Sequence, residues 1–200
     1  MGPTRQRDRA FRAAPSDHER ALSEAEAIDP PWFAAQAMAA VVRYAPEHRL
    51  AVLTRRTLAR ASQGEDAYQR GAVLSWLVRA LAERDQKSEA VKVLDEALRQ
   101  ALQATPAASR SEALYLLYNA AFPLGARAIT PLLRHLLALQ EAQPHWRCTR
   151  ALVWALAMHS TIDPGTVDSI LKHLPNPKIA ARVHRCITLG LTRPREFFWR

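Results

Sequence analysis

A phrase of ten residues occurs twice near the C-terminal end of this sequence. Residues 147–156 (RCTRALVWAL) and residues 182–191 (RVHRCITLGL) share the pattern Arg-x-x-Arg-small-aliphatic-x-x-small-Leu at an offset of 35 residues. A fixed offset in this range is typical of helical repeat arrays, in which each unit buries its apolar face only by stacking on its neighbour. The phrase therefore predicts a row of stacked helix pairs, with the arginines of neighbouring helices side by side.

The composition agrees with a helical fold. Ala and Leu dominate the 200 residues and only six are Gly, which favours helix because Ala and Leu are strong helix formers. No apolar run reaches the roughly 18–20 residues that a membrane-spanning helix needs. The basic first residues are not followed by the apolar stretch of a secretory signal. We therefore expect an all-α, cytoplasmic protein with no membrane partner.

Proline and capping residues mark the helix starts, as at Asp29-Pro30 and Asp163-Pro164. Helix pairs are predicted to begin near positions 32, 68, 110, 146 and 178, which are spaced by 36, 42, 36 and 32 residues. This drift suits degenerate repeats. We expect residues 16–200 to form a single right-handed α-solenoid (α–α superhelix) of about ten helices, in four to five helix-pair repeats.

Two segments resemble known repeat families. Between Tyr68 and about Gln103, the residues Ala90, Leu94 and Ala97 form a small–large–small stripe that resembles the second helix of a tetratricopeptide repeat. The segment 176–183 (NPKIAARV) resembles the opening of a HEAT repeat. Both resemblances imply the α–α superhelix of these repeat proteins.

The net charge of +9 is unevenly distributed along the chain. Residues 1–15 carry four Arg and one Asp, which predicts a flexible basic arm. Residues 16–126 are nearly neutral, with 13 basic and 14 acidic residues, whereas residues 127–200 carry 11 basic and 4 acidic residues. A cationic region of this kind attracts carboxylate or phosphate groups.

The candidate binding site is a basic and aromatic patch on the two repeated helices, because each copy places three side chains on one helix face. The residues are Arg147, Arg150, Trp154, Lys178, Arg182 and Arg185. Such a surface suits an acidic peptide with an aromatic residue, or a phosphate backbone. An alternative assigns the arginines to an internal ladder of ion pairs of the HEAT-repeat kind, with Asp163 and Asp168 as partners.

The second candidate element is the aromatic C-terminus, Phe197, Phe198 and Trp199. Three consecutive aromatic residues cannot all face the core from a helix, because successive residues are about 100° apart. One interpretation is a lid on the last open repeat, which solenoids need. The other is an exposed anchor that inserts into a partner, since aromatic residues dominate interface hot spots.

No catalytic or metal-binding motif is present in the sequence. The seven His form no H-x-x-x-H or H-E-x-x-H pair, and no Gly-rich phosphate loop or nucleophile elbow occurs. Cys148 and Cys186 are expected to be buried, reduced thiols. We expect no metal, no cofactor and no enzymatic activity.

The favoured function is a scaffold that presents a basic helical surface to a protein or peptide. The alternative is a HEAT-like protein whose arginines contact the phosphate backbone of a nucleic acid.

Overall fold

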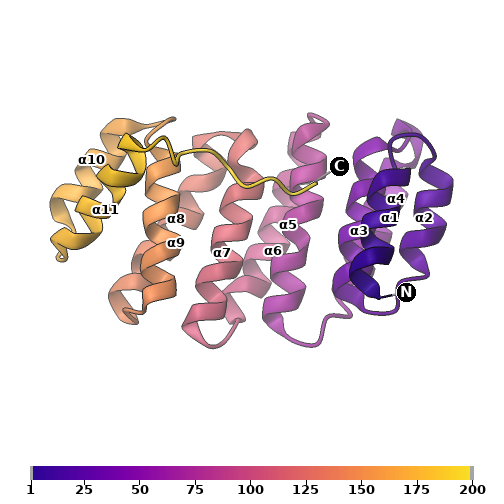
Figure 1. The fold of residues 1–200 in the computed structure, drawn as a ribbon, viewed down its shortest axis with the longest axis horizontal. Helices are drawn as coiled ribbons and strands as arrows, with labels where there is room; N and C mark the ends of the chain where they lie inside the picture. Colours follow the sequence, from indigo (N-terminus) through magenta and orange to yellow (C-terminus); the bar gives the residue numbers. More distant parts are fainter. Residues whose placement is uncertain (1, 199–200) are drawn as a thin grey trace.

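The computed structural model describes residues 2–198, and this part of the chain is helical with no strand (Figure 1). It contains eleven α-helices and two short 3₁₀ helices, η1 (Glu47–Arg49) and η2 (Phe122–Leu124). The α-helices are α1 (Pro3–Ala13), α2 (His18–Glu26), α3 (Pro31–Tyr44), α4 (Leu50–Ala61), α5 (Ala67–Glu83), α6 (Lys87–Gln103), α7 (Ala107–Ala121), α8 (Ala126–Ala142), α9 (Trp146–His159), α10 (Pro164–His173) and α11 (Pro177–Thr188). None of these helices combines the length and the apolar character that crossing a membrane requires.

The helices stand side by side in a row along the long axis of the molecule (Figure 1). Helices α3, α5, α7, α9 and α11 pack against one another in that order and form one layer, called layer A below. Each of α3, α5, α7 and α9 also packs against the helix that follows it in the sequence. The pair starts expected near positions 32, 68, 146 and 178 lie within one residue of the starts of α3, α5, α9 and α11.

Short polar side chains set several helix starts. Asp66 accepts a hydrogen bond from the backbone N–H of Gln69 at 2.7 Å at the start of α5, and Asp163 accepts one from Thr166 at 3.0 Å at the start of α10. Asn176 caps α11 in the same way. These bonds satisfy donors that the first turn of a helix leaves without partners, so the local sequence fixes where each helix begins.

Small residues allow the helices to pack closely. A Cβ atom at Gly71 in α5 would lie 2.7 Å from the backbone nitrogen of Ala101 in α6, so these two helices approach more closely than any larger residue would permit. The main buried cluster extends from Phe11 in α1 to Phe197 beyond the end of α11. Both ends of the described chain therefore contribute to one core.

The N-terminal segment differs from the expected flexible arm, because residues 3–13 form helix α1. Ala10 and Phe11 are buried where α1 packs on α2 and α3. Arg7 is only 8% exposed, and its Nη1 atom donates to Oε1 of the buried Gln36 at 2.8 Å. The basic composition of this segment concealed a short apolar stripe, through which α1 packs on its neighbours. With α1 included, the described residues form eleven α-helices instead of about ten.

Candidate interaction face

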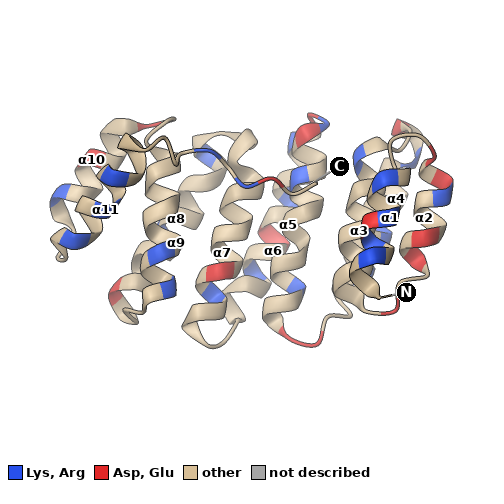
Figure 2. Cartoon of the chain, viewed as in Figure 1, with Lys and Arg blue, Asp and Glu red and all other residues tan. Residues whose placement is uncertain are grey.

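The two copies of the repeated phrase lie on α9 and α11, which are neighbours in layer A. The first two positions of the phrase have the same environment in both copies: Cys148 and Val183 are buried, whereas Arg147 and Arg182, which precede them, are exposed. The two copies differ at their ends, because Leu156 is buried in α9 whereas Leu191 is exposed beyond α11. Figure 2 shows basic positions on both helices along the side of the molecule that the chain end crosses.

The first copy forms a compact arrangement around Arg150. Its guanidinium carbon lies 5.2 Å from the ring centroids of both Trp146 and Trp154. Its Nη2 atom lies 3.0 Å from Oε2 of Glu112 on the neighbouring helix α7. Stacking between two indoles and the ion pair together fix the position of this guanidinium.

The aromatic rings around this arginine remain accessible. Trp146 is 58% exposed and Trp154 is 37% exposed. Arg147 lies over the Trp146 ring at 5.3 Å, and Tyr115 on α7 contacts the Trp154 ring with a centroid distance of 5.5 Å. We call Trp146, Arg147, Arg150 and Trp154 the Arg–Trp cluster. Its exposed indoles and Arg147 are free to contact a ligand, whereas Arg150 is already held in place.

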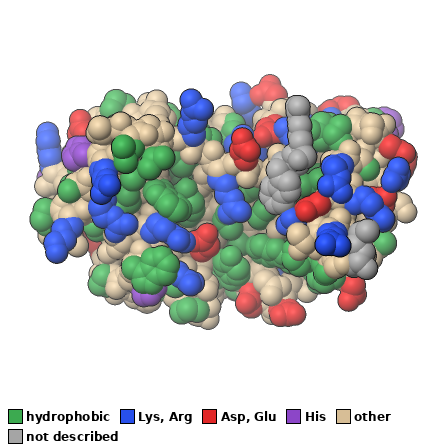
Figure 3. Space-filling model, viewed as in Figure 1, with side chains coloured by type: hydrophobic (Ala, Val, Ile, Leu, Met, Phe, Trp, Pro, Cys, Tyr) green, Lys and Arg blue, Asp and Glu red, His purple; other side chains and the backbone are tan. Residues whose placement is uncertain are grey.

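The second copy contributes cations that have no counter-ion in the described chain. Lys178, Arg182 and Arg185 are exposed on one flank of α11. Of the five cationic residues in the predicted patch, only Arg150 has an ion-pair partner within residues 2–198. Basic and hydrophobic side chains lie together at the α9–α11 end of the molecule (Figure 3).

The predicted Asp–Arg ladder does not form between α9, α10 and α11. Asp163 accepts hydrogen bonds from the hydroxyl of Thr166 at 2.6 Å and from its backbone N–H at 3.0 Å, and these bonds lower the pKa of the carboxyl group. Asp168 is exposed and has no ion pair with any described residue. Asp163 is therefore a helix cap, and among the described residues of α9, α10 and α11 the one arginine that forms an ion pair, Arg150, does so with Glu112.

A glycine turns the chain back after α11. Gly190 has a φ of +68°, a conformation that glycine adopts without strain. The N–H of Leu191 donates to the carbonyl of Cys186 at 2.9 Å and the N–H of Gly190 donates to that of Ile187 at 3.0 Å, which is the Schellman pattern of a helix end. Residues 191–198, called the C-terminal segment below, then run back across layer A towards α5 (yellow in Figure 1).

The C-terminal segment is anchored on α7 and α5. The backbone N–H of Arg195 donates to Oδ1 of Asn119 at 2.8 Å, and Nε1 of Trp76 donates to the carbonyl of Phe197 at 3.1 Å. Phe197 is 2% exposed, and its ring meets the Trp76 ring at 5.3 Å and 82°. The segment therefore belongs to the core as well as to the surface of layer A.

The last described residue extends this contact to the N-terminal end of the row. The ring of Phe198 lies 5.7 Å from that of Phe11 in α1, and the guanidinium carbon of Arg43 lies 5.0 Å from it. Trp199, the third aromatic of the predicted tail, lies outside the described residues. The segment thus closes on α5 and α1 instead of covering the open end of α11, and Phe197 points into the core instead of outward.

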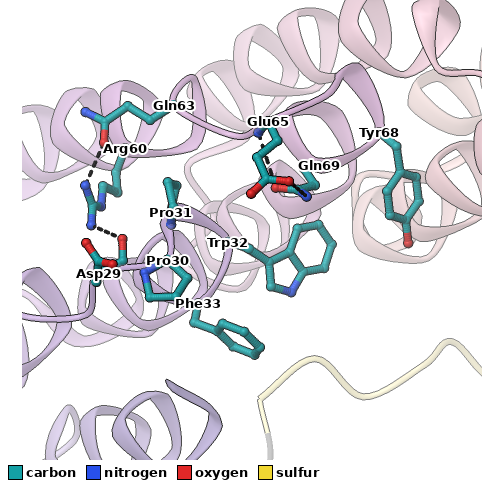
Figure 4. Close-up of a pocket in the computed structure, with 10 residues that line it drawn as sticks. All are labelled: Asp29, Pro30, Pro31, Trp32, Phe33, Arg60, Gln63, Glu65, Tyr68 and Gln69. Carbon is teal, nitrogen blue, oxygen red and sulfur yellow. Dashed lines mark hydrogen bonds between the residues drawn. The ribbon is translucent and has the colours of Figure 1, made fainter. Parts of the chain in front are cut away.

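A concavity of about 780 Å³ opens at the N-terminal ends of α3 and α5 (Figure 4). Its wall includes Trp32 and Tyr68, whose rings stack at 6.0 Å and 17°. Trp32 also meets the edge of Trp76 at 5.9 Å, so the wall continues towards the C-terminal segment. Arg60 donates to the backbone carbonyls of Ile28 and Asp29 at 2.6 Å each, so the cation of this concavity is already engaged.

Sequence reasoning missed three residues of this face, namely Trp146, Trp76 and Asn119. Trp146 precedes Arg150 by four residues and Trp154 by eight, so helical spacing alone places the three on one face. Trp76 and Asn119 lie inside apolar helical patterns, and nothing in the local sequence separates them from other buried residues.

The ionisable side chains in the core, His159 and Tyr118, contact each other. His159 is fully buried between α7 and α9, its Nδ1 atom lies 2.9 Å from the hydroxyl of Tyr118, and burial lowers its pKa. Burial also raises the pKa of Tyr118. Cys148 is buried and Cys186 is half-buried, and both are free thiols. Across residues 2–198, no three His, Cys, Asp or Glu side chains gather in a way that could hold a metal ion.

Comparisons with protein-family models, with curated proteins and with solved structures found no match for this chain.

Proposed function

We propose that this protein is a non-enzymatic interaction scaffold that presents layer A to an acidic segment of a partner protein. The observation that carries the proposal is the set of exposed cations on α9 and α11 that lack ion-pair partners among the described residues, beside two exposed indole rings. Arginine next to exposed aromatic rings is the composition of interface hot spots.

The chemistry of the Arg–Trp cluster favours carboxylates combined with aromatic groups. The exposed Arg147 can donate two parallel hydrogen bonds to one carboxylate, and Arg182 offers the same fork on the next helix. Hydrogen bonds to charged groups contribute about 1.5–3 kcal/mol each. The Trp146 and Trp154 rings offer apolar area to an aromatic side chain. Because Glu112 already fixes Arg150, little ordering is required on binding.

The finer architecture that we propose is a right-handed α-solenoid. Its support is the sequence of contacts along layer A, in which each helix packs on the one before and the one after it, together with the phrase repeated at 35 residues. Stacked repeats hold equivalent side chains of successive helices at a fixed spacing. A scaffold of this kind suits an extended partner that crosses several helices.

A titration with a defined acidic peptide tests the proposal. The probe is a fluorescein-labelled nonapeptide with the sequence (Glu-Glu-Tyr)₃, followed by fluorescence anisotropy at about 150 mM salt, where exposed charges are largely screened beyond about 8 Å. We expect the Arg147→Glu/Arg182→Glu double variant to bind about tenfold or more weakly than the wild type. The matched control is Arg127→Glu/Arg134→Glu, which makes the same change in charge at two exposed positions of α8.

Two outcomes of this titration would contradict the proposal. Equal losses of affinity in both double variants would show that bulk charge, and not the face of α9 and α11, attracts the peptide. A single-stranded oligonucleotide of similar charge that binds more tightly than the peptide, with an affinity that falls steeply with salt, would favour the nucleic-acid hypothesis instead.

A further inference from the structure

The surface of α5 and α7 that the C-terminal segment covers, called the groove below, carries two buried polar side chains that form hydrogen bonds with the segment's backbone. Asn119 is 0% exposed and accepts from the N–H of Arg195; Trp76 is 3% exposed and donates to the carbonyl of Phe197. These backbone groups belong to residues i and i+2, which point to the same side of an extended chain. The groove therefore offers one acceptor and one donor at the spacing of an extended peptide.

Neither hydrogen bond depends on the side chains of the segment. Arg195 and Glu196 are exposed, and Arg195 reaches Asn119 through its backbone only. The Nδ2 atom of Asn119 donates to the carbonyl of Tyr115 at 2.7 Å, which leaves Oδ1 directed at the segment. Recognition of this kind sets the register of any extended chain in the groove, whatever its sequence.

Selectivity comes from the position that Phe197 occupies. Its ring packs edge-on against Trp76, and Trp32 packs against the same indole at 5.9 Å. Rings that meet at their edges favour an aromatic occupant over an aliphatic one. The next position, Phe198, is half-buried between Phe11 and Arg43, so it also suits an aromatic residue.

The segment is held by contacts that can be broken without unfolding a helix. It has no helix or strand of its own, and in the described part of the chain no backbone–backbone hydrogen bond is made beyond Leu191. Among the contacts that attach it to layer A are one fully buried side chain, one half-buried ring and two hydrogen bonds from side chains to its backbone. A competing peptide can reproduce every one of these contacts.

From these contacts we infer that the groove on α5 and α7 is a peptide-binding site, that the C-terminal segment is its intramolecular occupant, and that a partner protein displaces it with an extended segment whose aromatic residue takes the place of Phe197. This site adjoins the Arg–Trp cluster through Tyr115, whose ring contacts Trp154 and whose carbonyl accepts from Asn119, but it does not rest on the function proposed above. It requires an aromatic residue at one position and no acidic charge.

The test uses the full-length chain and a fluorescein-labelled peptide, Arg-Pro-Arg-Glu-Phe-Phe, which corresponds to residues 193–198 and is blocked at both ends. In the wild type the resident segment competes with the peptide for the groove. The apparent affinity for the peptide is therefore lower than the intrinsic affinity, in proportion to the fraction of molecules whose groove is open. We expect Phe197→Ala to raise the affinity for the peptide about tenfold or more by emptying the groove. Glu196→Ala, at an exposed position of the same segment, is the matched control and should bind as the wild type does.

A second pair of variants separates groove binding from damage to the fold. Arg195→Pro removes the N–H that Asn119 accepts and keeps Phe197, so it should also raise peptide affinity. Adding Trp76→Phe to Phe197→Ala keeps a ring in the groove but removes the donor, and should reverse the gain. A peptide with Ala in place of its first Phe should not bind.

The inference is overturned if Phe197→Ala, folded by circular dichroism, binds the peptide no better than the wild type. Should that variant unfold, the same result with Arg195→Pro decides. Peptide binding that Trp76→Phe leaves unchanged would place the site elsewhere. A dimer that forms by exchange of C-terminal segments between copies, and that excludes the peptide in every variant, would contradict the assignment of a partner protein as occupant.

Discussion

The N-terminal half and the C-terminal third of the row are built from the same kind of helix pair, but they differ in whether their arginines form ion pairs. In the N-terminal half, arginines pair with acidic residues of other helices, as Arg56 does with Glu26 and Arg43 with Glu83. Beyond Arg150, the described residues of the C-terminal third form no ion pair. The same architecture therefore folds with and without internal counter-ions, so the paired arginines support the fold and the others are available to a ligand.

The largest expected contrast is between Arg84 and Arg182. Arg84 Nη1 donates to the carbonyl of Val42 at 3.1 Å and to that of Ala45, and its Nη2 meets Glu47 at 3.0 Å. Removal of a partly buried charged donor with several hydrogen bonds of this kind lowers the free energy of unfolding by about 2–3 kcal/mol. Arg182→Ala should change it by less than about 0.5 kcal/mol. Urea unfolding of both variants measures the contrast, and equal losses would break the distinction between paired and unpaired arginines.

The pH dependence of stability should distinguish the buried His159 from the exposed cations of the C-terminal third. Burial lowers the pKa of His159 in the folded state below its ordinary value of 6.5, so the unfolded chain binds this proton more readily. The stability due to neutral His159 is therefore complete above about pH 6.5 and is lost as the pH falls towards the folded-state pKa, with a slope of at most about 1.4 kcal/mol per pH unit.

Urea unfolding at pH 7.5 and pH 5.5 tests this dependence, with His159→Gln as the variant that cannot titrate at this position. The wild type should lose more stability than the variant between the two values. Asp163, whose pKa is lowered by its bonds to Thr166, changes stability only at more acidic pH, as its carboxyl becomes protonated. An identical pH response of both proteins would mean that His159 is not the buried titrating group.

The turn at Gly190 gives a smaller effect. An alanine would have to adopt the left-handed φ of +68°, which costs roughly 1–2 kcal/mol. Gly165 in α10 is the control, because a Cβ there would meet its nearest neighbour at 3.7 Å, an ordinary contact. Gly165→Ala should be neutral or slightly stabilising, whereas Gly190→Ala should lower the thermal midpoint. The opposite order would show that the reversal after α11 is not fixed by this turn.

The smallest expected effect is the coupling between Arg150 and Glu112. Their side chains are 33% and 31% exposed, and partly exposed ion pairs contribute below about 1 kcal/mol because water screens them. A double-mutant cycle of Arg150→Ala and Glu112→Ala, measured by urea unfolding, should give about 0.5 kcal/mol. A coupling several times larger would make this pair part of the fold and weaken its assignment to the interaction face.

Sequence reasoning located the helices well because their determinants are local. Helical spacing of apolar residues and capping at Asp66, Asp163 and Asn176 act within a few residues. The N-terminal helix was missed because four arginines among the first 15 residues suggested a solvated arm, while its docking depends on the packing of Ala10 and Phe11 against α2 and α3.

The candidate sites were predicted only in part. The flank shared by Arg147 and Arg182 followed from the repeat, but the partner of Arg150 did not, because Glu112 lies 38 residues away in the sequence. The course of the C-terminal segment depends on contacts between Asn119 and Arg195 that span 76 residues. Contacts of this length leave no periodic pattern in the sequence, so they could be found only from the structure.

The most direct test of the central claim is a competition titration on the wild-type chain. The labelled (Glu-Glu-Tyr)₃ peptide is bound first and is then challenged at about 150 mM salt with a single-stranded oligonucleotide of equal charge, or with the unlabelled peptide. We predict that the unlabelled peptide displaces the probe at far lower concentration than the oligonucleotide does, and that Arg147→Glu/Arg182→Glu weakens probe binding about tenfold or more. Displacement by the oligonucleotide at the lower concentration, or full probe binding by the double variant, would contradict the account.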